Sequence, residues 1–261
     1  MSETSQENSS NAQRKGLQPA LEYLLAEKIN TLLWMIRMGS IMFTVLYMIP
    51  LFGVNPYNYY YKALMSNAAT SALRLHQRLH NVRFSFTREF FARLLLEDSC
   101  HYLFYSLIFL YVYPMTLVLL PIFLFAVLHF SSYSLALLDK LGQVDRSFYD
   151  GFLVSFFGSI TERHSKKFFR LISFTEIFLM PLTIFMIFSG HGNILTPFIY
   201  YRFLTLRYAS RRNPYTRAMF HEMKLFIEMC CNHSKCPTGI KVLCYKLMGF
   251  LSRLAPLTPT Q

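Results

Sequence analysis

The chain is short of charge, of cysteine and above all of acidic residues. Charged residues make up only 15% of its 261 residues, whereas soluble domains average roughly 25%, so it lacks the polar surface that a globular protein of this size needs. Five cysteines are too few for a disulfide-stapled scaffold. An apolar fraction of 53%, with 26 Phe and 17 Tyr, excludes an intrinsically disordered chain.

The longest uncharged stretch indicates where the chain resides. No Asp, Glu, Lys or Arg occurs in the 40 residues from Ser99 to Leu138. At a rise of about 1.5 Å per residue, a helical stretch of this length extends about 60 Å, enough for two crossings of a hydrocarbon core roughly 30 Å thick. The sequence therefore predicts an all-α integral membrane protein.

Five apolar segments are expected in or at the membrane: residues 31–54, 99–113, 114–138, 171–189 and 194–208. Pro114 is the expected reversal between the second and third segments, and Ser189–Asn193, with its two glycines, is the expected turn between the fourth and fifth. The second and fifth segments are short, so whether each crosses the bilayer fully stays open. The fifth carries Arg202 and Arg207, and an interfacial position is its alternative.

Amphipathic helices are expected between these membrane hairpins, at about residues 60–80 and 87–96, the latter capped by Thr87. This divides the chain into a mostly disordered polar tail over residues 1–30, a membrane domain over 31–213 and a basic amphipathic region over 214–261. In the last helix of that region, apolar residues gather on one face and basic residues lie elsewhere. The apolar set includes Leu243, Leu247 and Leu251, and the basic set is Lys241, Lys246 and Arg253.

Basic residues predict the orientation. Ten Lys/Arg and two acids follow from Arg202 onward, and residues 55–98 and 139–170 hold six Lys/Arg each. If the second and third segments form one hairpin and the last two another, all three basic regions lie on one side, which the positive-inside rule makes cytosolic. The C-terminus is then cytosolic and the N-terminus lumenal. Asn232, in an Asn-His-Ser sequon, should carry no glycan.

Four polar residues at apolar segments form a candidate buried polar cluster: Glu97, Asp98, His101 and Glu176. Glu97 and His101 are spaced i, i+4, as a metal or proton site requires, but no second cluster of ligands accompanies them. Acids capping a helix N-terminus explain the same residues without catalysis. Glu176 is either an ion or proton site or a structural partner of Arg202. We expect no catalytic residue, no metal and no cofactor.

Two further patterns have membrane explanations. Cys230, Cys231 and Cys236, with His221 and His233, fit no zinc-site spacing, and reversible palmitoylation of Cys230 or Cys231 is the stronger alternative. Bases interleaved with aromatics after residue 200 suit lipid headgroups better than a nucleic acid. The candidate membrane-surface contacts are Arg202, Arg207, Arg211, Arg212, Lys241, Leu243, Lys246, Leu247, Leu251 and Arg253.

Several long strings resemble one known family. They are TSALRLHQRL (Thr70–Leu79), LLEDSCHYL (Leu95–Leu103), EIFLMP (Glu176–Pro181), PFIYYRFLTLRY (Pro197–Tyr208), SRRNPY (Ser210–Tyr215) and SRLAP (Ser252–Pro256). They are similar to the transmembrane protein 33 family, which includes Krüppel homologue 2 of insects and pore-membrane proteins of yeasts, and the resemblance spans residues 31–256. The resemblance implies no catalytic residues.

The resemblance also implies a place and a role. It implies a non-enzymatic, multi-pass protein of the endoplasmic reticulum membrane and nuclear envelope that organises tubular membrane with reticulon-type proteins and supports nuclear pore organisation. One-sided hairpins and interfacial helices favour curvature by adding area to one leaflet, which leads to the same role. Two alternatives stay open: a small channel or transporter using Glu176, and an intramembrane enzyme using Glu97, Asp98 and His101.

Overall fold

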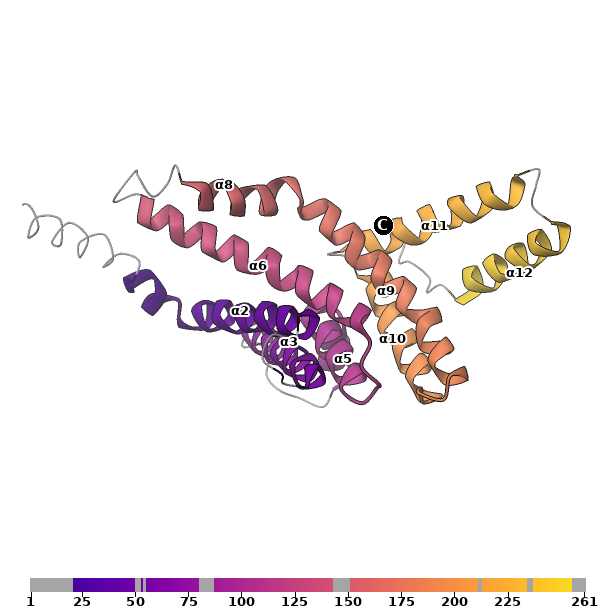
Figure 1. Ribbon diagram of the computed structural model, residues 1–261, viewed down its shortest axis with the longest axis horizontal. Helices are drawn as coiled ribbons and strands as arrows, with labels where there is room; N and C mark the ends of the chain where they lie inside the picture. Colours follow the sequence, from indigo (N-terminus) through magenta and orange to yellow (C-terminus); the bar gives the residue numbers. More distant parts are fainter. Residues whose placement is uncertain are drawn as a thin grey trace, which may run out of the picture. The chain divides into compact units, whose positions relative to one another are not determined.

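Helices are the regular secondary structure of the described fold. The computed structural model describes residues 21–49, 53, 55–79, 87–142, 151–210, 213–233 and 237–254, and none of these forms a strand. The order is α2 (Lys28–Met48), α3 (Pro56–Leu79), α4 (Arg88–Leu95), α5 (Asp98–Leu110), α6 (Thr116–Gly142), α8 (Phe152–Gly158), the π-helix η1 (Ser159–Arg163), α9 (Ser165–Phe188), α10 (Leu195–Ala209), α11 (Tyr215–Asn232) and α12 (Thr238–Leu254) (Figure 1). The prediction of an all-α membrane protein is confirmed.

Helix lengths separate the apolar segments into two kinds. α2, α6 and α9 are each long and apolar enough to cross a membrane. α5 has 13 residues and α10 has 15, which correspond to only about 20 Å and 22 Å of helix, short of a roughly 30 Å core. α2 ends at Met48, before the predicted end at residue 54, and residues 21–26 are already helical within the predicted N-terminal tail. Residues 1–20 of that tail lie outside the described part.

Two of the three candidate spans, α2 and α9, bury polar side chains and expose large apolar ones. α2 buries Arg37, Ser40 and Thr44, and the Ser40 and Thr44 hydroxyls donate to backbone carbonyls one turn back. On its other side the side chains of Met35 and Met42 are more than half exposed. α9 repeats the pattern: its buried residues include Ser173, Thr175, Glu176 and Thr183, and its exposed residues include Phe174, Phe178 and Phe185. This distribution suits lipid, because the hydrocarbon solvates apolar side chains and excludes polar ones.

The described chain divides into two compact units, each with its own core. In the first (Met1–Leu73 and Ile122–Phe168), Trp34 of α2 stacks on Phe130 of α6 with ring centroids 5.4 Å apart. The Trp34 indole N–H donates to Ser134 Oγ at 2.9 Å, so its polar atom is satisfied. Tyr47 of α2 packs on Tyr60 of α3, and these two helices lie side by side (Figure 1).

The core of the second unit (Arg74–Pro121 and Phe169–Gln261) is aromatic. Tyr105 and Phe109 of α5 pack against Tyr200 and Phe203 of α10, with ring centroids 5.2–6.4 Å apart between the helices. The two tyrosine hydroxyls donate to backbone carbonyls: Tyr105 to Val118 and Tyr200 to Glu176. Because all four rings are buried, α5 and α10 are held together and Tyr200 ties α10 to α9.

A glycine turn ends α9. The Gly190 N–H donates to the Ile187 carbonyl and the His191 N–H to the Met186 carbonyl, both at 3.1 Å, which is the Schellman pattern. Gly190 has φ +75°, a conformation that costs a side-chain-bearing residue energy. The chain reverses here into α10, at the turn that the sequence predicts.

Gly192 of the same turn is expected to tolerate no side chain. A Cβ atom there would lie 2.8 Å from both the Ile187 nitrogen and the Met186 carbonyl carbon, which are backbone atoms. We therefore expect Gly192→Ala to lower the stability of the purified protein by about 1–3 kcal/mol. Gly249→Ala is the matched control because a Cβ at Gly249 in α12 meets nothing within 4 Å. A thermal-melting comparison in which both variants unfold together would contradict this account of the turn.

Candidate functional site

Charged side chains from three helices meet in the second unit. Asp98 and His101 lie in the first turn of α5, Glu176 lies in α9 and Arg207 lies near the end of α10. We call these four residues the buried charge cluster. His101, Glu176 and Arg207 are at most 1% exposed, whereas Asp98 keeps 29% of its side chain exposed. The cluster therefore opens to solvent only at Asp98.

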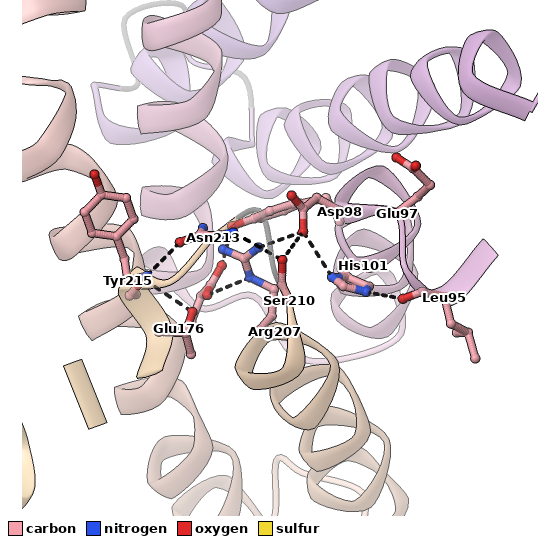
Figure 2. Close-up of polar contacts among 12 residues, drawn as sticks. Leu95, Glu97, Asp98, His101, Glu176, Arg207, Ser210, Asn213 and Tyr215 are labelled. Atoms are coloured by element: carbon pink, nitrogen blue, oxygen red, sulfur yellow. Dashed lines mark hydrogen bonds and ion pairs between the residues drawn. The ribbon is translucent and has the colours of Figure 1, made fainter. Parts of the chain in front are cut away.

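Arg207 lies at the centre of the cluster, with its guanidinium group between the two carboxylates (Figure 2). Its Nε donates to Glu176 Oε2 at 3.1 Å, and its Nη1 lies 3.6 Å from Asp98 Oδ1. The guanidinium carbon also lies 5.1 Å from the centre of the Tyr102 ring, within cation–π range. The Tyr102 hydroxyl donates to the second oxygen of Glu176. Each carboxylate therefore faces a cation, and Glu176 gains a hydroxyl donor.

The cluster also holds the loop that follows α10. The Ser210 hydroxyl donates to Asp98 Oδ1 at 2.8 Å and accepts from the Asn213 N–H at 3.3 Å. Asn213 Oδ1 in turn accepts from the Tyr215 N–H at 3.1 Å, at the start of α11. These contacts form a chain from α5 through the loop to α11 (Figure 2). They give a structural reason for the SRRNPY string, although Arg211 and Arg212 lie outside the described residues.

His101 is held as a neutral imidazole. Its Nε2 lies 2.7 Å from the Leu95 carbonyl, which can only accept, so Nε2 carries the proton. Burial lowers the pKa of His101 below its usual value, and the nearby Arg207 adds to this, while the Leu95 carbonyl and Asp98 oppose it. A neutral ring leaves Nδ1 without a proton, and Nδ1 lies 3.7 Å from Asp98, beyond hydrogen-bond distance. His101 therefore supports the backbone at the α4–α5 junction.

Replacing His101 with Gln should preserve folding and cellular function, because an amide can still donate to the Leu95 carbonyl. The variant should also be less sensitive to acid. In the wild type the unfolded chain takes up a proton at His101 near pH 6.5, which the folded protein resists, so the wild type loses stability below that pH. Unfolding at pH 7.5 and 5.5 measures the difference. A folded, correctly localised but inactive variant would instead assign His101 a chemical role.

Glu97 lies apart from the buried charge cluster. Its side chain points away from Arg207 (Figure 2) and pairs with Arg78 of α3 at 2.6 Å. Arg78 is 42% exposed, and an ion pair this open to solvent contributes about 0–1 kcal/mol. Within the described residues, no three His, Cys, Asp or Glu side chains are placed to hold a metal ion.

Two sequence-based assignments change. Arg207 is not a membrane-surface contact: it is 1% exposed because two carboxylates and the Tyr102 ring surround it. Glu176 pairs with Arg207 and not with Arg202, which is exposed on the same helix. Tyr102, Ser210 and Asn213 were missed. One signal in the sequence could have indicated that Arg207 faces the protein. Tyr200, Phe203 and Arg207 lie three and four residues apart, so they share one face of the helix.

A second candidate site is the α11–α12 hairpin, in which the two helices pack on each other (Figure 1). Cys231 of α11 and Met248 of α12 are buried. The hairpin nevertheless leaves large apolar side chains exposed: Leu225, Phe226, Met229, Val242, Leu243 and Tyr245. Of the predicted membrane contacts, Leu243 and Lys246 are exposed and Lys241 is half-buried. The side chains of Leu247, Leu251 and Arg253, and all of Cys236, lie outside the description.

Comparisons with known proteins agree on one family. The profile of "Transmembrane protein 33/Nucleoporin POM33" matches residues 12–257. Human Transmembrane protein 33 is 44% identical over 92% of this chain and 95% of its own length. Krueppel homolog 2 of Drosophila melanogaster is 44% identical over 90% of this chain and 82% of its own, and the Caenorhabditis elegans homolog is 38% identical over 90% and 84%. No solved structure matches significantly.

Proposed function

Because the chain belongs to the Transmembrane protein 33/Nucleoporin POM33 family, we propose that it organises the shape of the endoplasmic reticulum and the nuclear envelope without catalysing a reaction. In this proposal it inserts α5–α6 and α9–α10 as hairpins from the cytosolic side and lays α11–α12 on the same leaflet. Reticulon-type proteins and components of the nuclear pore are its proposed partners.

The observation that carries the proposal is the geometry of the buried charge cluster. Asp98 begins α5, Arg207 lies in the last turn of α10, and Glu176 lies in the first half of α9. Their ion pairs put these parts of the helices at one level. The basic segments adjoining that level, including α4 and the chain after α10, then lie on one membrane side, and the positive-inside rule makes it cytosolic.

Insertion from one side of the membrane is the proposed means by which the protein curves it. α5 and α10 are too short to cross fully, so each hairpin occupies more area in the leaflet it enters than in the other. The exposed apolar side chains of α11–α12 would add area to the same leaflet, as interfacial helices do. Unequal leaflet areas favour curvature, which tubular reticulum and the pore membrane both require.

Reconstitution into liposomes tests the function. We expect vesicles to become narrower or tubular as the protein-to-lipid ratio rises, with no leakage of trapped dye or ions. Round vesicles that leak ions would contradict the proposal and favour a channel using Glu176. Round vesicles holding protein with one tightly bound metal would favour an enzyme using Glu97, Asp98 and His101.

A further inference from the structure

We propose that α8 is an in-plane membrane anchor that inserts the side chains of Phe152, Leu153 and Phe156 into an anionic lipid surface. This inference concerns α8 and the basic residues that link it to the apolar part of α9. It rests on the insertion of α5–α6 proposed above, and it holds or fails independently of any role in shaping membranes.

The apolar face of α8 is exposed. Phe152 is 81% exposed, Leu153 53% and Phe156 48%. The rings of Phe152 and Phe156 stack with their centroids 5.9 Å apart and an interplanar angle of 21°, so the two side chains form one continuous surface. Exposing three large apolar side chains in seven residues is costly in water, at about 1.5–3 kcal/mol for each side chain left unburied.

The other side of α8 fixes the depth of the helix. Phe157 packs edge-on against Phe130 of α6, with ring centroids 6.1 Å apart. α6 has 27 residues, about 40 Å of helix, which exceeds a roughly 30 Å core by about 10 Å. In the proposed hairpin, α5 is about 20 Å long, so Thr116 lies about 20 Å below the cytosolic boundary. Phe130 lies about 21 Å further along α6 and is therefore at that boundary. Interfacial helices bury their apolar faces to about 5–10 Å, so α8 lies at the depth that such a helix takes.

Charge identifies the surface as anionic lipid. The chain passes from α8 through η1 into α9, a candidate span. Three exposed cations, Arg163, Lys166 and Lys167, follow the apolar face before the apolar part of that span begins. They outnumber the one exposed acid of the same stretch, Glu162. Each basic residue near an anionic leaflet contributes about 1 kcal/mol. Aromatic side chains followed by exposed cations are the pattern of a helix lying in the headgroup region.

A π-helix, η1, lies between α8 and α9 and supplies the bend that the proposal requires. In η1 the His164 N–H donates to the Ser159 carbonyl five residues back, and the Thr161 hydroxyl donates to the Phe157 carbonyl. A π-turn widens the helix locally and changes its course. In this proposal it lets one nearly continuous helical run contain both an in-plane segment and a spanning segment.

Fluorescence quenching by brominated lipid tests the anchor in the full chain. Trp34 is the only tryptophan, so a Trp34→Phe background allows one reporter at a time, and Phe can keep the stacking on Phe130. In nanodiscs with acyl-chain bromines, the Phe156→Trp reporter should be quenched several-fold more than the Ser155→Trp reporter. Ser155 is also exposed and is the one polar residue of α8. Phe152→Trp provides a second reporter if Phe156→Trp fails to fold.

Two further measurements complete the test: how quenching depends on lipid charge and how it depends on the amount of protein per disc. Adding phosphatidylserine to phosphatidylcholine should increase quenching of the Phe156→Trp reporter, and Lys166→Gln with Lys167→Gln should remove that increase. Equal, weak quenching at positions 155 and 156 would overturn the anchor. Quenching that falls as more protein is loaded per disc would assign the face to a second copy and overturn it too. An unchanged response to phosphatidylserine in the double variant would overturn the anionic surface.

Discussion

Replacing Arg207 with Met is expected to lower the free energy of unfolding by about 3–5 kcal/mol, the usual cost of leaving a buried charge without its partner. Glu176 is fully buried and would keep only the Tyr102 hydroxyl among the contacts to its carboxylate described above. The measurement is unfolding of the purified protein in mixed micelles by increasing denaturing detergent. The total stability of an ordinary domain is only about 5–15 kcal/mol. The expected loss is a large part of that total, so poor expression is also expected.

Two further variants distinguish the loss of the Arg207 ion pairs from general damage to the fold. Arg202→Met removes the same charge from the same helix, but Arg202 is exposed, so its cost should stay within about 0.5 kcal/mol. Adding Glu176→Gln to Arg207→Met should recover much of the lost stability, because the uncompensated charge is gone. Equal losses for Arg202→Met and Arg207→Met would contradict the central position of Arg207 in the cluster.

Leu243→Asp is expected to weaken binding of the 214–261 segment to anionic vesicles by about 100-fold. Leu243 is 58% exposed on α12. Removing its burial in lipid costs roughly 1.5–3 kcal/mol, and placing a negative charge beside anionic lipid adds about 1 kcal/mol. Co-sedimentation of the segment with small, highly curved vesicles measures the change.

Lys246→Ala is the matched control for that prediction. Lys246 is exposed on the same helix, and losing one basic residue costs about 1 kcal/mol, or roughly fivefold in affinity. Salt should weaken the wild-type segment only partly, since screening acts on charges and not on apolar burial. A segment that stays in solution with curved anionic vesicles would show that this apolar surface serves the protein's own packing.

The sequence predicts the helices well because their signals are local. The 40 uncharged residues, the turn glycines and Thr87 each act within a few residues, and Thr87 does cap α4 by accepting from the Phe90 N–H. Glu176 stood out for a similarly local reason, as an acid inside an apolar segment. For the same reason, the predicted ends of α5 and α10 differ from the observed ends by only a few residues.

The sequence alone could not predict which residues contact one another in the buried charge cluster. Tyr102 meets Glu176 across 74 positions, and Ser210 meets Asp98 across 112, so no spacing rule connects them. Arg207 was misplaced because α10 has apolar residues all around, and such a helix gives no sign of which side faces the protein. Its burial depends on two carboxylates from other helices, which only the fold brings to it.

Labelling of single cysteines in sealed microsomes tests the central claim, that the basic segments lie on the cytosolic side and the α9–α10 turn does not. One variant keeps only Cys230, which is exposed on α11, and the other replaces exposed His191 in the turn with Cys as its sole thiol. A membrane-impermeant maleimide added outside should label Cys230 at once, and should label the His191→Cys variant only after detergent. Protection of Cys230, or immediate labelling at position 191, would contradict the account.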